Sequence, residues 1–243
     1  MELNTALIRS RRSRGLPQPF QAVRAFVIPV PSKAKAVTSI MKRTVGSLRK
    51  RSIDMCGRYL FKQDEDDELE EWLKNLDVEE AKDLSLHVVY PSQKTIVLTQ
   101  GLKPMIAQWG HVKWDNKGRI INARSETIAS SPFFENHLKK RRCLIKADGF
   151  YEWDKEKAKH LVTDASQNPF YMAGIYDEEG CFSILTNEVR TDFIQLHNRV
   201  PLMIPSNLLN KYLENGDQLL EDFRKLKQNE LKWVDQSIQQ RLF

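Results

Sequence analysis

Cys56 is the residue whose place in the chain offers the most distinctive chemistry. It directly follows Met55, so removal of the residues up to Met55 would leave a cysteine at the new N-terminus. Such a cysteine carries a free α-amine beside its thiol: the amine condenses with an aldehyde, and the thiol then closes a thiazolidine ring. Because an α-amine titrates at about pH 8, part of it is a neutral nucleophile at physiological pH. The other interpretation is a small cysteine of the hydrophobic core.

Two further residues have side chains suited to acid–base catalysis. Glu152 lies between Tyr151 and Trp153, and burial among aromatic rings favours the protonated carboxyl that a general acid needs. The alternative for Glu152 is an outward position on an alternating strand. His197 follows a short helical pattern and stands four residues before Pro201. A histidine in that position acts as a general acid near neutrality or caps the end of a helix.

A polar segment and a basic–aromatic stretch indicate contacts with nucleic acid. Residues 122–127 read Asn-Ala-Arg-Ser-Glu-Thr and supply an amide, a guanidinium and hydroxyls for phosphate or sugar, although a capped helix start looks similar. Between Trp109 and Arg142, Lys and Arg residues are interleaved with aromatic ones, Trp114 among them. This pattern suits single-stranded nucleic acid, and a solvated basic loop is the alternative.

Metal chemistry is not indicated. Neither the five histidines nor the three cysteines have the spacing of metal ligands, and we expect no metal or other cofactor. His160 is expected in a charged loop.

The hydrophobic pattern predicts a sheet-rich middle with helices towards the ends. Strands are predicted at 95–99, 105–109, 143–147, 150–153, 169–176 and 181–186. Helices are predicted at 64–76, 192–197, 206–216 with Ser206 as the N-cap, and 218–226. Strands that cluster without βαβ alternation are typical of an α+β fold with a largely antiparallel sheet.

Charge divides the chain into two unlike parts. Residues 1–54 hold twelve Lys or Arg and two acids, a net +10, whereas the other 189 residues hold 26 bases and 30 acids, a net −4. The basic part has no sustained period and is typical of a disordered or removed leader. It is interpreted as a misassigned start ahead of Met55, a transit peptide or a pro-segment, and residues 55–243 as a single catalytic domain. No apolar run reaches the roughly 18 residues of a membrane span, so we expect no membrane association.

Seven segments, in this order, resemble the SOS response-associated peptidase family, whose members shield abasic sites in DNA. They cover about residues 55–205 and are Met55-Cys56-Gly57-Arg58-Tyr59, Pro91-Ser92-Gln93, Trp109-Gly110 with Trp114, Asn122 to Thr127, Arg142 to Trp153, Ala173 to Tyr176, and His197 to Pro201.

The resemblance implies a fold of twisted antiparallel sheets in a barrel-like arrangement with flanking helices. It also implies binding of single-stranded DNA that contains an abasic site. The residues that match the family's catalytic positions are the nucleophile Cys56, the positioning amide Asn122, the acid–base group Glu152, and His197, which protonates the opening sugar. The residues that match DNA-binding positions are Arg58 and Arg124 on phosphates and Trp114 beneath a base.

The implied activity joins these residues to the aminothiol chemistry. The α-amine of Cys56 attacks the sugar aldehyde, and the thiol closes a thiazolidine that shields the strand from cleavage. The family name also implies a peptidase activity, such as removal of the protein's own residues ahead of the cysteine. We expect a hydrolase or lyase of the DNA-damage response, a monomer in the cytoplasm and on the nucleoid, or in an organelle if the leader is a transit peptide.

The chain departs from the family in a few places. An asparagine is usual shortly before Pro91, where this chain has Val88-Val89-Tyr90, and the segment after about Gly216 matches poorly, with Trp233 to Ser237 only an echo of a closing strand. Above all, Cys56 is internal in the 243-residue chain and has no free amine. Two rival functions follow: a cysteine hydrolase that uses internal Cys56 with His197 and Glu152, and a non-catalytic reader of single-stranded or modified DNA.

Overall fold

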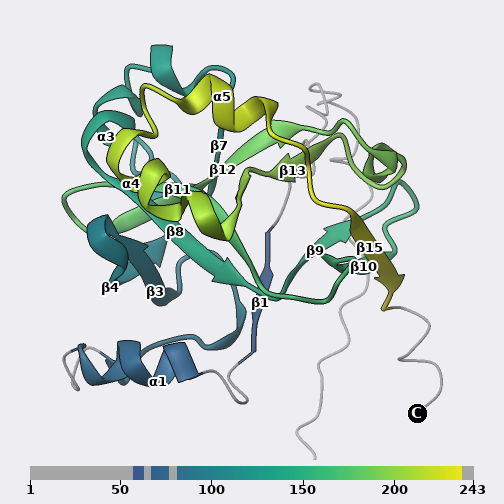
Figure 1. The fold of residues 1–243 in the computed structure, drawn as a ribbon, viewed down its shortest axis with the longest axis horizontal. Helices are drawn as coiled ribbons and strands as arrows, with labels where there is room; N and C mark the ends of the chain where they lie inside the picture. The colour runs from purple at the N-terminus through teal and green to yellow at the C-terminus, as the bar shows by residue number, and fades with distance from the viewer. Residues whose placement is uncertain (1–56, 63–66, 77–80, 237–243) are drawn as a thin grey trace, which may run out of the picture. The chain divides into compact units, whose positions relative to one another are not determined.

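Strands make up most of the regular secondary structure of the described residues (Figure 1). The structure is a computed structural model that describes residues 57–62, 67–76 and 81–236, all within one compact unit. The strands are β1 (Tyr59–Phe61), β2 (His87–Val89), β3 (Lys94–Thr99), β4 (Lys103–Trp109), β5 (His111–Val112), β6 (Arg119–Ile120), β7 (Asn122–Arg124), β8 (Arg142–Ala147), β9 (Gly149–Trp153), β10 (Lys159–Asp164), β11 (Phe170–Tyr176), β12 (Cys181–Glu188), β13 (Arg199–Pro201), β14 (Met203–Ile204) and β15 (Leu231–Asp235).

The helical elements are short. The α-helices are α1 (Asp67–Lys74), α3 (Glu135–Lys140), α4 (Leu209–Asn215) and α5 (Leu220–Lys225). The 3₁₀ turns are η1 (Gln100–Leu102), η2 (Ile128–Ser130), η3 (Asp192–Gln195) and η4 (Ser206–Leu208).

The larger sheet closes on itself as a barrel. β12 pairs with β4, β4 with β3, β3 with β8, β8 with β11, and β11 again with β12. Only the β12–β4 pairing in this ring is parallel. Helices α3 and α4 pack against this sheet, and in Figure 1 they lie beside β8 and β11. The expected α+β fold of barrel-like antiparallel sheets with flanking helices is confirmed.

A second sheet carries the candidate catalytic strand. Its order is β15-β10-β9-β1-β2, and all four pairings are antiparallel. Tyr59 of β1 meets Trp109 of the barrel edge-on, with ring centroids 5.2 Å apart, and Phe150 and Val162 on neighbouring strands belong to the same buried cluster. One hydrophobic cluster therefore joins the second sheet to the barrel, and a second cluster joins the barrel to helices α3, α4 and α5.

Two glycines permit close approaches that any side chain would block. A Cβ on Gly149 would meet the Val162 carbonyl oxygen at 2.7 Å, so β9 can lie this close to β10 only with glycine there. Gly110, between β4 and β5, has φ +108°, and a Cβ there would meet Arg119 at 2.8 Å.

Six predicted strands are present within one or two residues of their predicted ends. Helix 64–76 appears as α1 and helix 218–226 as α5, while helix 192–197 is the 3₁₀ turn η3. The N-cap prediction at Ser206 is wrong: Pro205 is the capping residue, and Ser206 is the first residue of η4, which leads into α4.

The structure also decides two alternatives that the sequence left open and corrects one prediction. The segment that begins at Asn122 starts as strand β7 rather than as a capped helix. His160 lies on β10 and not in a loop. The poorly matching C-terminal segment does form a closing strand, β15, because Trp233 packs on Phe193 with ring centroids 5.8 Å apart and the strand completes the sheet beside β10. The division of the chain at residues 54 and 55 stays a prediction.

Candidate active site

Glu152 is a carboxylate enclosed in the fold. It lies on β9, where its side chain has 0% exposure. The interpretation of Glu152 as an outward residue of an alternating strand is therefore wrong: both faces of this strand are covered, and Glu152 shares its face with Phe150 of the core. An enclosed carboxylate is the kind of group that acid–base chemistry uses.

The start of β1 lies beside this carboxylate. Tyr59 is the register partner of Phe150, and the Arg58 carbonyl accepts the Tyr151 N–H at 2.9 Å. The same antiparallel register places Gly57 opposite Glu152. A Cβ on Gly57 would meet no heavy atom of the described residues within 4 Å, so there is open space at this end of the strand. Cys56, which is bonded to Gly57, lies outside the described residues.

His197 is held close to β9 by its own turn. The His197 N–H donates to the Phe193 carbonyl at 3.0 Å, and the Phe193 ring packs on Phe150 with centroids 5.9 Å apart. Phe150 and Glu152 are two residues apart on one face of β9. The aromatic contact therefore brings the histidine segment to the strand that carries the carboxylate.

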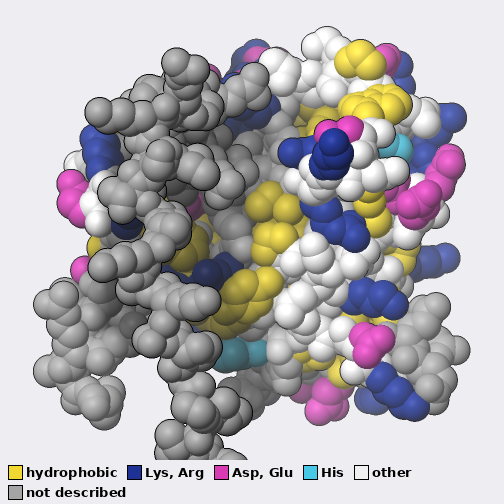
Figure 2. Space-filling view, turned by 180° about the vertical axis from the view of Figure 1, so that it is seen from behind, with side chains coloured by type: hydrophobic (Ala, Val, Ile, Leu, Met, Phe, Trp, Pro, Cys, Tyr) yellow, Lys and Arg dark blue, Asp and Glu magenta, His cyan; other side chains and the backbone are white. Residues whose placement is uncertain are grey.

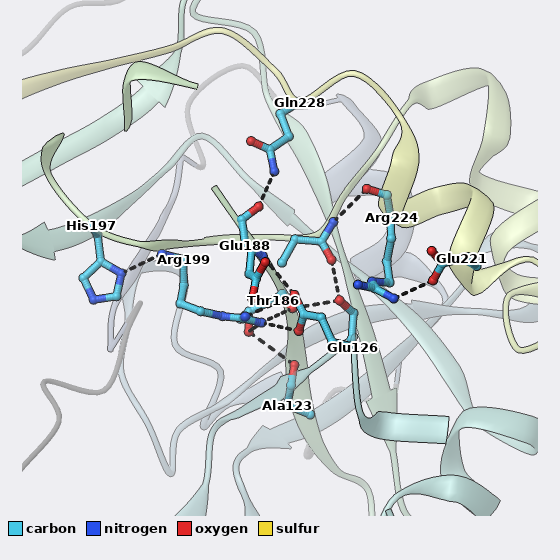
Figure 3. Close-up of polar contacts among 11 residues, drawn as sticks. Ala123, Glu126, Thr186, Glu188, His197, Arg199, Glu221, Arg224 and Gln228 are labelled. Carbon is cyan, nitrogen blue, oxygen red and sulfur yellow. Dashed lines mark hydrogen bonds and ion pairs between the residues drawn. The ribbon is translucent and has the colours of Figure 1, made fainter. Parts of the chain in front are cut away.

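The backbone fixes which nitrogen of His197 carries the proton. The Arg199 N–H donates to Nδ1 at 3.1 Å, so the neutral ring must be protonated at Nε2. Figure 3 shows that this second nitrogen is turned away from the Arg199 network. Burial lowers the pKa of His197 below its ordinary value of 6.5. The neutral ring thus presents an Nε2–H donor.

Asn122 and His197 belong to segments that lie on the two sides of β12. β7 runs parallel to β12, with Asn122 opposite Ile184. β13, which follows His197, is antiparallel to β12 and begins with Arg199 opposite Glu188. Within β7, Ala123 is buried and Arg124 is exposed, so the arginine faces solvent beside the half-buried Asn122.

An ion pair across β12 joins these two segments (Figure 3). The Arg199 guanidinium donates to both carboxylate oxygens of Glu126, at 3.1 and 2.8 Å, and to the carbonyl and hydroxyl of Thr186. Burial alone would raise the pKa of the Glu126 carboxyl, but the hydrogen bonds and charge of Arg199 outweigh it and lower the pKa. The pair therefore stays charged and holds the Asn122 and His197 segments together.

The outer face of β1, β9 and β10 carries cations on aromatic rings, and we call it the cationic face. The Arg58 guanidinium lies 4.9 Å from the Tyr90 ring centroid and 5.0 Å from that of Trp153, while Lys159 Nζ lies 4.1 Å from that of Tyr151. Tyr90 is 40% exposed. Arg58 and Lys159 offer charge for phosphates on this face, and the exposed Tyr90 offers a ring for a base.

Trp114 stands apart from these groups. It follows β5 in the β5–β6 connection, is 79% exposed, and meets Phe133 edge-on with centroids 5.2 Å apart. Its exposure suits a stacking role. No contact among the described residues joins Trp114 to Glu152 or His197.

Sequence reasoning missed the pairing of Glu126 with Arg199 and placed His160 in a loop rather than beside Glu152. Both members of the ion pair stand inside quoted segments, but 73 positions separate them, so only the β7–β12–β13 pairing reveals the contact. Within residues 57–62, 67–76 and 81–236 there is no cluster of His, Cys, Asp and Glu that could hold a metal ion. No helix of this part is long and apolar enough to cross a membrane.

Known proteins resemble this chain in both sequence and fold. It is 31% identical over 173 residues to the abasic site processing protein YoqW of Bacillus subtilis, covering 62% of this chain and 76% of that protein. It is 28% identical over 178 residues to the abasic site processing protein YedK of Escherichia coli, covering 65% and 79%. A solved structure from Bacteroides thetaiotaomicron shares the fold, with a TM-score of 0.61 at 19% identity over 74% of this chain and 91% of that one.

The family comparison spans the whole body of the chain. Residues 55–239 match the family described as SOS response associated peptidase (SRAP). This range includes every segment on which the sequence resemblance rests and all the strands of both sheets. The chain belongs to the SRAP family.

Proposed function

We propose that this protein processes abasic sites in single-stranded DNA by forming a covalent thiazolidine crosslink through Cys56. The observation that carries the proposal is the enclosed carboxylate of Glu152 beside the start of β1. Only two residues, Gly57 and Arg58, separate Cys56 from Tyr59, the first residue of that strand. Relatives at 31% and 28% identity are named abasic site processing proteins, which supports the same substrate class.

The proposed reaction balances with the loss of one water. Opening of the deoxyribose moves the proton of the C1′ hydroxyl to the ring oxygen, with the Glu152 carboxylate as carrier and the Nε2–H of His197 donating a hydrogen bond to the ring oxygen, and it leaves an aldehyde at C1′. The α-amine of Cys56 adds to the aldehyde, and water leaves to give an imine. The thiol then adds across the C=N bond, with sulfur on carbon and its proton on nitrogen. Glu152 accepts and returns the protons, and Asn122 orients the sugar–amine linkage.

DNA reaches the site along positive and aromatic surface. In the proposal, Arg58 on the cationic face and exposed Arg124 on β7 contact phosphates, and Trp114 stacks on a base. Figure 2 shows Lys and Arg side chains beside hydrophobic ones on one face of the molecule. Because residues 55–243 carry a net charge of −4, DNA binding depends on these local groups rather than on total charge. A single copy of the protein suffices for this reaction.

The reaction requires a free amine on Cys56. We therefore propose that the active polypeptide begins at Cys56, whether translation starts at Met55 or the preceding residues are removed, with self-cleavage as the peptidase activity. In this proposal the protein acts as a lyase on abasic sites and as a hydrolase on its own chain. It works wherever single-stranded DNA is exposed in the cell.

The test incubates residues 56–243, with the initiator methionine removed, with single-stranded DNA that bears one abasic site. We expect a heat-stable adduct. Cys56→Ser should lose the stable adduct but keep an imine that borohydride traps, because the α-amine survives. His87→Gln, an exposed position on β2, is the matched control and should behave as the unsubstituted protein.

Two outcomes would replace the proposal with its rivals. Reaction of the 243-residue chain with a peptide or acyl probe, and not with abasic DNA, would indicate the internal-cysteine hydrolase. Reversible binding without any adduct, unchanged by Cys56→Ala, would indicate a non-catalytic reader.

A further inference from the structure

His160 occupies a position that faces the candidate acid–base group. On β10 it is the register partner of Glu152 on β9, and on its other side it is the register partner of Asp235 on β15. Directly opposed residues of antiparallel strands share a face, with Cβ atoms about 4.5–5.5 Å apart. His160 therefore lies on the inner face of the sheet, next to Glu152.

The hydrogen bonding of His160 fixes its tautomer. Nε2 lies 2.8 Å from Oδ2 of Asp154, which follows β9 at its end. The hydrogen bond from His160 lowers the pKa of Asp154, so this carboxylate is ionised and can only accept. Nε2 must then carry the proton, which leaves a lone pair on Nδ1. Nδ1 is buried and has no hydrogen-bond partner within the described residues.

Exposure increases step by step along this set of side chains. Glu152 has 0% exposure, the His160 side chain 12% and the Asp154 side chain 21%. A carboxyl that gives and takes protons while wholly enclosed needs a route by which those protons reach water. The three groups form an ordered path from the interior to the surface.

We propose that His160 and Asp154 form a proton relay that connects Glu152 to solvent, an inference that rests on the proposed function of Glu152. Because Nδ1 of His160 makes no direct hydrogen bond to Glu152, a bridging water carries the proton from the Glu152 carboxyl to Nδ1 as the Nε2 proton passes to Asp154 and on to bulk water. In the reverse direction, Asp154 returns a proton to Nε2 and the Nδ1 proton goes back to Glu152. No proton is gained or lost by the ring over one cycle. His160 and Asp154 are positioning residues, since they touch no substrate.

The kinetic test compares crosslinking rates in the form of the protein that reacts. His160→Gln keeps a hydrogen-bonding side chain but cannot pass a proton, and we expect a rate about tenfold lower, less than the 10²–10⁴-fold effect of a direct acid–base group. Added imidazole should restore the rate of His160→Gln and leave Glu152→Gln slow. Asp154→Asn should slow the reaction more than Asp235→Asn, which removes the same charge from the other neighbour of His160.

A spectroscopic test does not depend on the reaction. In the 243-residue chain with ¹⁵N-labelled histidine, His160 should show a protonated Nε2 and an unprotonated Nδ1. Glu152→Gln should shift the Nδ1 resonance, whereas His87→Gln should not. A ring protonated at Nδ1, or an Nδ1 signal indifferent to Glu152→Gln, would overturn the relay even if His160→Gln failed to fold.

The two proposals fail in different ways. If the unsubstituted protein forms no adduct with abasic DNA, the proposed function is wrong. If it forms the adduct and His160→Gln does so equally fast, the relay alone is wrong.

Discussion

A carboxylate without contact to water, as at Glu152, is stable in a fold only when its surroundings offset the lost hydration. Here β9, the strand that carries Glu152, is hydrogen-bonded to β1 on one side and to β10 on the other. The same enclosure that makes the group costly also separates its protons from bulk water. The proposed acid–base role of Glu152 rests on this enclosure.

Replacing Glu152 by glutamine should separate chemistry from binding. The amide is of nearly equal size and cannot transfer protons, so crosslinking should slow by about 10²–10⁴-fold while affinity for single-stranded DNA stays within about twofold. Rates come from gel quantification and affinities from fluorescence anisotropy. Loss of DNA binding in parallel with the rate would mean that Glu152 supports the fold instead.

His111 should make stability depend on pH. Its ring is 1% exposed, and burial lowers its pKa from 6.5 to about 4. Between these values the unfolded chain binds a proton that the folded chain does not, so the free energy of unfolding falls as pH drops from about 6.5 to about 4 and is unaffected above that range. The loss is roughly 3 kcal/mol.

Denaturant unfolding at pH 7 and pH 4.5 measures this effect. The ring lies 2.7 Å from the Ser183 hydroxyl, and His111→Gln keeps a polar side chain there without a titrating ring. The variant should lose less stability on acidification than the unsubstituted protein. Equal losses in both would assign the acid sensitivity to other groups.

At the scale of elements, the short strands β7 and β13 have too few residues to define a site by themselves. Their positions depend on β12 and on the Arg199–Glu126 pair that spans it. Glu126→Gln would leave one hydrogen bond in place of a charged, two-pronged contact. Arg199, and with it the N–H that orients His197, would then be held less firmly.

We expect Glu126→Gln to slow crosslinking by about tenfold, because the His197 ring loses part of its orientation. Glu188→Gln is the control, since that side chain is exposed at the β12 position opposite Arg199. The rates are compared at several pH values. An unchanged rate and pH profile for Glu126→Gln would show that His197 does not depend on the ion pair.

How well each strand could be predicted depended on its length and on how far it is buried. Strands such as β8 and β11, buried along nearly their whole length, give continuous apolar runs that stand out in the sequence. β7, β13 and β15 are short or half-buried, and only pairing with distant strands makes them regular. His160 was misplaced for the same reason: the charges around it suggest a loop, whereas β9 and β15 on either side make it part of a sheet.

At the scale of the whole molecule, the body is net negative and its DNA contacts must be local. Each phosphate contact that releases a counterion contributes a slope of about −0.7 in log K against log salt for a single strand. Arg124→Ala should therefore weaken binding with or without an abasic site and reduce the slope by about 0.7. Equilibrium binding at several salt concentrations measures it, and an unchanged slope would remove Arg124 from the interface.

The sequence predicted the site as a whole only because seven short segments occur in the same order as in the SRAP family. Spacing could not show that Glu152 is enclosed or that the start of β1 lies beside it, because both follow from the pairing of β9 with β1 and β10. Cys56 remains predicted from sequence alone, since it lies outside the described residues. The account of the molecule thus depends most on what that cysteine does.

Analysis of the adduct itself tests this claim most directly. Protein that has reacted with abasic single-stranded DNA is digested, and the DNA-linked peptide is identified by mass spectrometry. The account predicts a peptide that begins at Cys56, with the sugar attached and one water lost, whose cysteine resists alkylation and whose linkage resists borohydride. A linkage on a lysine, or a Cys56 thiol that still alkylates in the adduct, would contradict it.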